Sequence, residues 1–134
     1  SHSFPTRRSS DLAKKTALIL KKFVSNTKWE SNQLIVSSFD WDELIIFKNE
    51  NTDIPIGILN DKNTLNEVLD IAMKLDAVAI HPNFSSLNQE VVNTIHDSGF
   101  KIYSWTINAP EEIDKAITFG IDGIITDFPD RIPK

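Results

Sequence analysis

Short apolar runs alternate with amphipathic stretches along most of this chain. Runs of this kind, rich in β-branched and aromatic residues, favour buried β-strands. Between the runs, apolar residues recur at helical spacing and polar residues fill the other positions. The pattern therefore predicts a strand–helix alternation with strands at about 33–38, 54–59, 77–80, 102–107 and 123–126.

The spacing of these strands is nearly constant. They begin near positions 34, 55, 77, 101 and 123, so the steps are 21, 22, 24 and 22 residues. Strands that alternate with helices in this way, with right-handed crossovers, form a parallel sheet with helices outside it. Two α/β architectures fit: a small open doubly wound domain, or the last part of a (β/α)8 barrel whose earlier strands are absent.

Local signals predict where several helices begin and end. Asn108 is a predicted N-cap, Pro110 falls in the first turn of the helix that follows, and Gly120 supplies the left-handed residue that ends it. Asp40 and Thr64 are predicted caps of two earlier helices. The first helix, from Ala13 to about Asn26, is predicted to pack on a sheet through Leu18, Ile19 and Phe23.

Composition narrows the class of protein. A chain of 134 residues with 40% hydrophobic residues is a natural single globular domain. The net charge of -5 comes from 19 acidic and 14 basic residues without a basic cluster, so neither nucleic acid nor an anionic membrane is an expected partner. No apolar run approaches the roughly 20 residues that span a bilayer, and cysteine is absent. Cytoplasmic is the default location.

The first twelve residues, SHSFPTRRSSDL, differ from the rest because they show no periodicity. They resemble the translation of a common sequencing-adapter oligonucleotide. We therefore expect 1–12 to be a non-native or disordered tail and 13–134 to be the structured portion, with the true N-terminus and any signal peptide missing.

Five short motifs follow one another along the chain. They are Ile35–Asp40 (IVSSFD), Ile54–Leu59 (IPIGIL), His96–Phe100 (HxxGF), Tyr103–Asn108 (YxWTxN) and Asp122–Pro129 (DGIITDFP). Together, in this order, they resemble the C-terminal half of the glycerophosphodiester phosphodiesterase family. The resemblance runs from about Gln33 to Ile132, and the Trp-Thr-x-Asn and Gly-Ile-Ile-Thr-Asp-x-Pro motifs are the most specific of the five.

The resemblance implies a (β/α)8 barrel of the phospholipase-C-like type. Such enzymes cleave glycerophosphodiesters to glycerol 3-phosphate and an alcohol, using a divalent cation, Ca²⁺ or Mg²⁺. The family's early motifs, His-Arg-Gly, Glu-x-Asp, a further His and Glu-x-Lys, have no counterpart here. We therefore expect no catalytic residues and no bound metal in this chain, which should be inactive alone and should need the missing N-terminal half of the barrel as its partner.

Four residues are candidates for substrate binding. The resemblance places Trp105 in the substrate pocket, where its ring can cover a glycerol moiety; a core tryptophan is the alternative. His81 directly follows a strand. Its side chain either contacts a phosphate or is only part of the turn before Pro82. Ser37 and Ser38 end the first strand, and Ser38 is the one predicted to face the barrel interior. Asp127 ends the last strand, where loop hydrogen bonding is favoured over metal binding.

Two further polar residues, Asn108 and His96, are predicted to stabilise the fold and not to take part in catalysis. Asn108 falls on the face opposite Trp105 if the strand alternates, which favours a cap. His96 lies on a helix just before Gly99, where contact with the helix C-terminus is favoured over catalysis.

A self-contained open-sheet binding or signalling module is the alternative function. A receiver-like module needs an acidic cluster after its first strand to hold Mg²⁺. Here the strand ends are Ser37–Ser38, Leu59 and His81, which argue against it. A different phosphate-binding barrel is a third possibility, but it favours glycine-rich loops where Ala109–Pro110 and Phe128–Pro129 stand.

Overall fold

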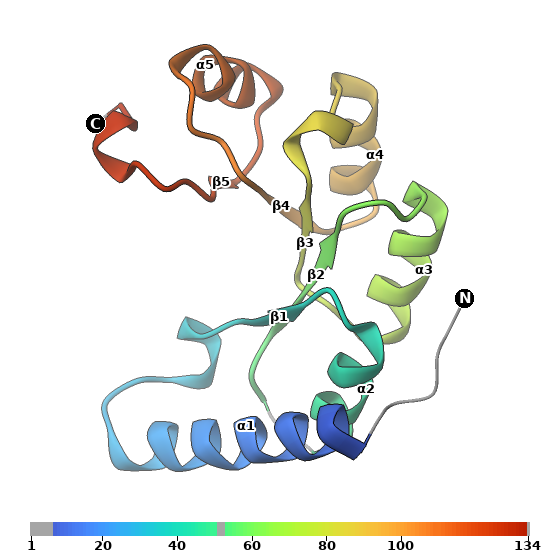
Figure 1. Cartoon of the computed structure of the whole chain (residues 1–134), viewed down its shortest axis with the longest axis vertical. Helices are drawn as coiled ribbons and strands as arrows, with labels where there is room; N and C mark the ends of the chain where they lie inside the picture. The colour runs from blue at the N-terminus through green and yellow to red at the C-terminus, as the bar shows by residue number, and fades with distance from the viewer. Residues whose placement is uncertain (1–6, 51–52, 134) are drawn as a thin grey trace.

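The computed structural model describes residues 7–50 and 53–133. In this part of the chain, five parallel strands lie side by side in chain order (Figure 1). The strands are β1 (Val36–Ser38), β2 (Ile56–Asn60), β3 (Ala79–Pro82), β4 (Lys101–Ser104) and β5 (Gly123–Ile124). The α-helices are α1 (Arg7–Asn26), α2 (Trp41–Asn49), α3 (Leu65–Lys74), α4 (Gln89–Asp97) and α5 (Pro110–Phe119). Single turns of 3₁₀ helix are η1 (Ser31–Gln33), η2 (Phe84–Ser86) and η3 (Pro129–Arg131).

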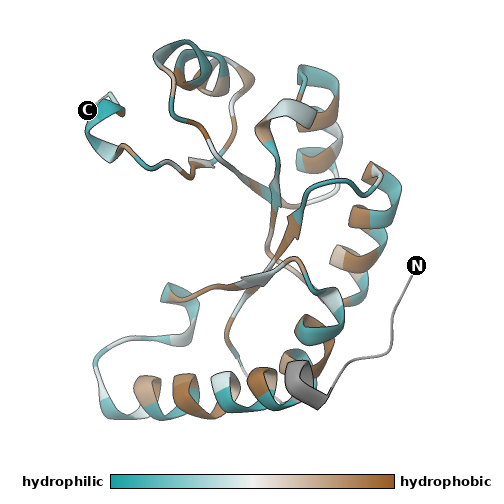
Figure 2. Cartoon of the chain, in the orientation of Figure 1, coloured by the Kyte–Doolittle hydropathy of each residue, from teal (hydrophilic) through white to brown (hydrophobic). Residues whose placement is uncertain are grey.

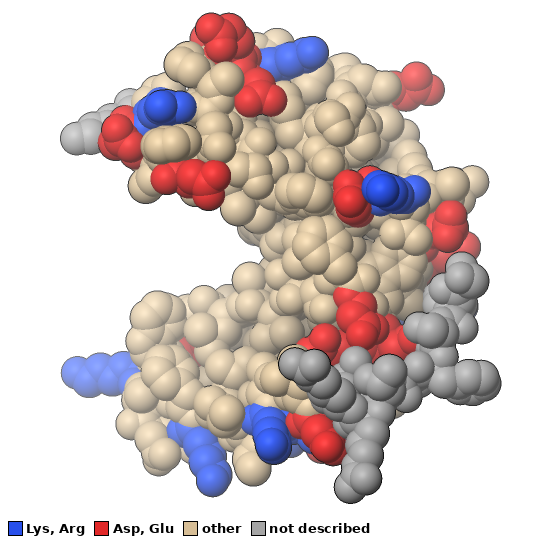
Figure 3. Space-filling view, in the orientation of Figure 1, with Lys and Arg blue, Asp and Glu red and all other residues tan. Residues whose placement is uncertain are grey.

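The strand order distinguishes between the two predicted architectures. A doubly wound sheet changes direction, as in the order 2-1-3-4-5, and has helices on both faces. Here the order is β1-β2-β3-β4-β5, and the helices lie around the outside of a curved sheet (Figure 1). This is the arrangement of a barrel wall, so the open-sheet architecture is wrong. The space-filling view shows the matching hollow, open to one side (Figure 3).

The main hydrophobic core lies between the sheet and the helices. Side chains alternate along a strand, and one set of strand residues, which includes Ile56, Ile58, Ile80 and Ile102, is buried against the helices. Helices such as α3 and α4 turn their apolar residues toward the sheet, as the hydropathy colouring shows (Figure 2). The other set faces the concave side, which we call the inward face. It is not covered by helices, so ligand-binding residues are sought there and at the carboxyl ends of the strands.

Most of the predicted helix ends are confirmed. Asp40 accepts a hydrogen bond from the Glu43 amide at 3.2 Å, and Thr64 forms a capping box with Glu67. Gly120 ends α5 with a φ of 76°. One cap is wrong, because the N-cap of α5 is Ala109 and not Asn108. Asn108 instead bonds to residues that follow β5.

The packing of α1 differs from the prediction. The helix begins at Arg7 and not at Ala13; residues 1–6, the remainder of the predicted tail, lie outside the described residues. Ala13 and Ala17 are buried with the α2 core residues, whereas Leu18 and Ile19 are 55% and 63% exposed. The predicted apolar face is therefore wrong. Small alanine side chains allow α1 to approach α2 closely, and no sheet lies beneath the larger residues.

Four of the five strands are shorter than the patterns predict. The chain leaves η1 at Gln33, and β1 is confined to Val36–Ser38. Strand β2 begins at Ile56, β4 ends at Ser104 and β5 ends at Ile124. Within the described ranges, no helix combines the length and the apolar character that crossing a membrane requires.

Candidate functional site at the carboxyl ends of the strands

Aromatic and polar side chains gather where the parallel strands end. We call this end of the sheet the carboxyl edge. Barrels and open parallel sheets both bind their ligands there, because the loops after the strands converge. Phe39 follows β1, Asn60 ends β2, His81 and Asn83 lie at the end of β3, and Trp105 follows β4. The geometry of these residues decides what the edge can bind.

Trp105 is held in place at the inward side of the carboxyl edge. Its indole Nε1–H donates to the His81 carbonyl oxygen at 2.8 Å, and its backbone is paired with that of Asn83 in a parallel bridge. The ring is only partly buried. The structure therefore presents a flat apolar surface in a fixed orientation, which a core tryptophan would not do.

Phe39 packs against Trp105, and sequence reasoning missed this contact. The two rings meet edge to face, with centroids 5.5 Å apart and an interplanar angle of 88°. Phe39 is 56% exposed and comes from the loop after β1, although β2 and β3 separate β1 from β4 in the sheet. The contact is possible only because the sheet is strongly curved. The available signal was a large apolar residue at a strand end among polar neighbours.

His81 lies below this aromatic pair and is almost fully buried, with 5% of its surface exposed. Its ring meets Tyr103 edge to face, with centroids 5.5 Å apart. Within the described chain, Nε2 is enclosed and has no hydrogen-bond partner. Burial lowers the pKa of His81 below its ordinary value of 6.5, because a charged imidazolium would lose its hydration. The side chain is therefore neutral at pH 7, and Nε2 reaches no ligand in this position.

Ser38 is directed toward the helices and not toward the inward face. It pairs in register with Ile58, a residue buried on the helix side. Its hydroxyl accepts the Asp40 amide hydrogen at 3.0 Å and donates to Glu43 at 3.5 Å. The neighbouring Ser37 pairs with Gly57. Ser37 is thus the serine on the inward face, contrary to the expected orientation of Ser38.

Asp127 belongs to a small loop network beyond β5. Its carboxylate accepts a hydrogen bond from the side-chain amide group of Asn108 at 3.1 Å. The side-chain oxygen of Asn108 accepts hydrogen bonds from the Thr126 hydroxyl at 2.9 Å and from the backbone N–H of Asp127 at 3.0 Å. The loop after β4 is thereby fastened to the loop after β5. Of the four predicted residues, Trp105 and His81 are brought together, whereas Ser38 and Asp127 bond to other groups.

A second set of hydrogen bonds connects α4, β4 and the turn before β5. The Asp122 carboxylate accepts hydrogen bonds from His96 Nε2 and from the Ile102 amide, each at 2.8 Å. Burial raises the pKa of Asp122, but the hydrogen bonds from Ile102 and His96 and the nearby charges of His96 and Lys101 outweigh that effect and lower it. His96 therefore bonds to a carboxylate and not to the helix C-terminus that the sequence predicts.

The described residues do not provide a site for a divalent cation. A hard cation such as Ca²⁺ or Mg²⁺ takes several converging oxygen ligands. No group of three acidic or histidine side chains with that geometry is found between residues 7 and 133, leaving aside 51 and 52. At the carboxyl edge, the Asp61 carboxylate accepts a hydrogen bond from the Asn83 side-chain amide at 3.2 Å.

The fold and the candidate site together define the class of protein to which this chain belongs. The chain is a wall of parallel strands in sequential order, with helices outside and an anchored aromatic pair at the carboxyl edge, as in part of a (β/α)8 barrel. A family model described as the glycerophosphoryl diester phosphodiesterase family matches residues 3–131. The chain therefore belongs to this family.

Curated relatives agree with the family assignment. A glycerophosphodiester phosphodiesterase of Caldanaerobacter subterraneus subsp. tengcongensis is 31% identical over 100 residues, which are 75% of this chain and 41% of that protein. One from Bacillus altitudinis is 30% identical over 105 residues, which are 77% of this chain and 42% of that protein. The chain thus spans about two fifths of the length of these relatives.

Solved structures share the fold. A glycerophosphoryl diester phosphodiesterase structure from Silicibacter pomeroyi superimposes with a TM-score of 0.75 at 26% identity, covering 89% of this chain and 42% of that one. An Oleispira antarctica phosphodiesterase in complex with the product sn-glycerol-3-phosphate superimposes with a TM-score of 0.76 at 22% identity, covering 91% and 49%. The fold is therefore the C-terminal part of a (β/α)8 barrel, with five parallel strands alternating with helices.

Proposed function

We propose that this chain forms one wall of the substrate pocket in an enzyme that hydrolyses glycerophosphodiesters to glycerol 3-phosphate and an alcohol. The observation that supports this most directly is the anchored Trp105 ring at the carboxyl edge, in a chain that belongs to the phosphodiesterase family. Its substrate partner would be a small glycerophosphodiester. Neither nucleic acid nor a membrane span enters the proposal.

The aromatic pair gives the wall its chemical character. Trp105 and Phe39 present an apolar surface whose orientation is fixed by a hydrogen bond and an edge-to-face contact. The carbon skeleton of a glycerol moiety can lie against such a surface while its hydroxyl groups point away toward water or polar groups. In this role Trp105 orients the substrate and takes no part in proton transfer.

The other candidate residues have different parts in the proposal. His81 supports Trp105 through its backbone carbonyl and reaches a substrate phosphate only if its ring turns away from Gly57. Ser38 stays bound to α2, so Ser37 is the better candidate for a polar contact on the inward face. Asp127 shapes the loop after β5.

The chain alone is proposed to be inactive. Hydrolysis of a phosphodiester needs a group that protonates the leaving alkoxide, and the buried, neutral His81 is poorly suited to this task. The divalent cation that the family resemblance implies finds no ligand set among the described residues. We therefore derive no step that passes through a metal, and the reactive groups in this proposal come from the complementary part of a barrel.

The test compares the chain with a chimera. The chain alone, given glycerophosphocholine with Ca²⁺ or Mg²⁺, should release no glycerol 3-phosphate above a protein-free control. A chimera that places the amino-terminal part of the Caldanaerobacter relative before Gln33 should release it. In the chimera, Trp105→Ala should lower kcat/KM by about tenfold, or ~1.4 kcal/mol of transition-state stabilisation. Met73→Ala, at a residue of α3 that is 56% exposed, is the matched control. Turnover by the chain alone would show that the catalytic assignment is wrong.

A further inference from the structure

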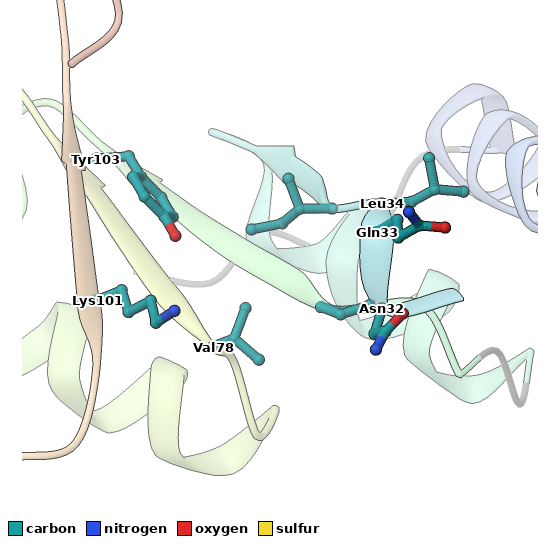
Figure 4. A pocket seen from close by; sticks show the side chains of 8 residues that line it. Asn32, Gln33, Leu34, Val78, Lys101 and Tyr103 are labelled. Carbon is teal, nitrogen blue, oxygen red and sulfur yellow. The ribbon is translucent and has the colours of Figure 1, made fainter. Parts of the chain in front are cut away.

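A second hollow lies on the inward face at the opposite end of the strands from Trp105. Its volume is about 460 Å³, and Figure 4 shows the side chains that line it. Its apolar lining consists of Leu34, Ile35, Pro55 and Val78, and its polar lining includes Lys101 and Tyr103 from β4. No acidic residue lines it. It is thus separate from the aromatic pair at the carboxyl edge and differs from it in charge.

Lys101 and Tyr103 direct their polar ends into this hollow. They alternate along β4 and therefore share its inward face (Figure 4). The ion pair found among the described residues joins His96 and Asp122, and Lys101 is not part of it. Lys101 acts on Asp122 only through its charge at a distance. Among the same residues, the Tyr103 phenol has no hydrogen bond. A cation and a phenol therefore face a hollow with nothing of opposite charge in it.

The hollow also leaves apolar surface uncovered. Ile35 and Val78 are 41% and 42% exposed, whereas Ile56 and Ile80 on the helix side are 1% exposed. In a closed barrel, residues of alternate strands fill the interior in layers, so an inward face is covered by strands from the other side. β1 and β5 each have one neighbour in the described sheet. Both edges are thus available for pairing.

From these observations we infer that the hollow receives complementary strands of the same barrel, which insert an acidic side chain between Lys101 and Tyr103. A (β/α)8 barrel has eight strands and the described sheet has five, which leaves three. The relatives are more than twice as long as the region matched here. The inserted carboxylate pairs with the Lys101 ammonium and accepts the Tyr103 O–H, while apolar neighbours cover Ile35 and Val78. The inference rests on the proposed barrel partner.

Charge argues against a second copy of this chain as the occupant. A copy that closed the barrel about its axis would bring a second Lys101 to the same layer. Two ammonium groups facing one enclosed space repel each other and lose hydration. A partner strand that carries Asp or Glu has neither problem.

The experiment titrates the full chain with the amino-terminal part of the Caldanaerobacter relative, the portion that precedes the matched region. We expect a one-to-one complex by calorimetry. Lys101→Met should weaken it at least tenfold, and Lys101→Glu more than a hundredfold. Lys74→Met, which removes an exposed lysine at the end of α3, should leave the affinity unchanged. Raising the salt concentration should weaken the wild-type complex more than the Lys101→Met complex. Far-ultraviolet circular dichroism spectra establish that each variant keeps the secondary structure of the wild type.

The outcomes of this experiment test the inference separately from the proposed function. Absence of a complex, or equal affinity for the wild type and Lys101→Met, overturns the inference. A dimer of the chain alone that is lost in Lys101→Met also overturns it. A complex that depends on Lys101 but does not hydrolyse glycerophosphocholine supports the inference and contradicts the proposed function. A complex that hydrolyses glycerophosphocholine, and whose affinity is unchanged by Lys101→Met, supports the proposed function and overturns the inference.

Discussion

Gly57 makes room for the His81 ring on the inward face of the sheet. β2 and β3 are neighbours, and Leu59 pairs with His81 in register. A Cβ atom on Gly57 would lie 2.4 Å from His81 Nε2 and 2.9 Å from Cδ2. These distances are shorter than any normal contact, so the glycine is required by the close approach of the ring. Its φ angle is not the reason.

Gly57→Ala should therefore destabilise the fold. We expect a loss of about 1–3 kcal/mol of unfolding free energy, the usual cost of overpacking a well-filled site. In a His81→Ala background the same change should cost less than about 0.5 kcal/mol. The two closest atoms are then gone, and only the end of the Ile35 side chain, with Cδ1 at 3.2 Å, has to move slightly. Urea unfolding of the chimera described above, with the wild-type sequence, with each single change and with both, measures the difference. An equal cost in both backgrounds would mean that the ring is not what excludes the methyl group.

The buried His81 also predicts how stability depends on pH. Its folded pKa is lowered by burial, so the unfolded chain binds a proton more readily. The stabilising contribution is complete above the unfolded value of about 6.5 and is lost as pH falls below it. The unfolding free energy should thus decrease from pH 7 to pH 5. The lowered pKa of Asp122 also makes the unfolding free energy decrease as pH falls, but only below its ordinary pKa of 3.8. The two contributions therefore fall in different pH ranges.

Two histidine variants distinguish His81 from other groups in that range. In urea unfolding of the same chimera, His81→Gln should flatten the decrease between pH 7 and pH 5, because the substituted side chain does not titrate. His96→Gln removes an imidazole that is hydrogen-bonded to Asp122 and should leave the part due to His81 in place. If His81→Gln retains the full decrease, burial of His81 is not its cause.

At the scale of the elements, Asp122 connects three parts of the fold. It receives hydrogen bonds from the last turn of α4 and from the second residue of β4, and it directly precedes β5. The Ile102 residue is fully buried, so its amide has no access to water if the carboxylate is removed. The Asp122 side chain therefore reinforces the backbone hydrogen bonds that attach the short strand β5 to β4.

Asp122→Ala should cost about 1–3 kcal/mol, because a buried amide loses its acceptor. Asp122→Asn keeps an oxygen at the same place and should cost less. Amide hydrogen exchange at Ile102 should become faster in Asp122→Ala, and this local readout identifies the lost bond. Asp114→Ala, at an exposed position on α5, is the matched control. Unchanged exchange at Ile102 would contradict the proposed attachment.

The sequence predicted those features that depend on neighbouring residues. The strand positions, the Asp40 and Thr64 caps and the Gly120 terminus follow from local patterns, and all of them are found. The partner of α1 and the role of Asn108 depend on residues far away in the chain. Asn108 bonds to residues 18 and 19 positions later, and this pairing cannot be seen in a helix-cap pattern.

The same distinction applies to the candidate site. Placing Trp105 and His81 at the carboxyl edge requires only the strand ends and the family resemblance. The contact between Phe39 and Trp105 depends on how strongly the sheet curves, because their strands are not neighbours. Curvature is a property of the whole sheet, and single-residue patterns contain no measure of it. The orientation of Ser38 likewise depends on register, where a shift of one residue exchanges the two faces.

At the scale of the whole molecule, the described sheet is an open arc with two unprotected edges. An edge strand exposes unpaired backbone groups and is a template for pairing with other chains. Figure 3 shows the hollow between the two ends of the arc. We therefore expect the chain, expressed alone, to aggregate or to require a complementary half. A monomeric product that melts cooperatively would contradict this.

The β1 edge offers a pair of proline variants that test the origin of aggregation. The Val36 amide donates to the carbonyl oxygen of Pro55, the residue before β2, at 2.9 Å, so it lies on the side of β1 that faces β2. Successive amides of a strand point in opposite directions, which places the Ser37 amide on the open side. Proline at 37 thus removes an outward donor without removing a bond to β2, whereas proline at 36 removes an existing bond.

Ser37→Pro should slow aggregation several-fold, measured by light scattering, while the thermal midpoint stays within a few degrees of the wild type. Val36→Pro should lower the midpoint and accelerate aggregation, because it breaks the sheet that β1 completes. Ser37→Pro should also prevent association with the amino-terminal part of the Caldanaerobacter relative, since the partner strand would meet a ring where it needs an N–H group. If Ser37→Pro aggregates as fast as the wild type and still binds the partner, pairing occurs elsewhere and the β1 edge is not where the barrel closes.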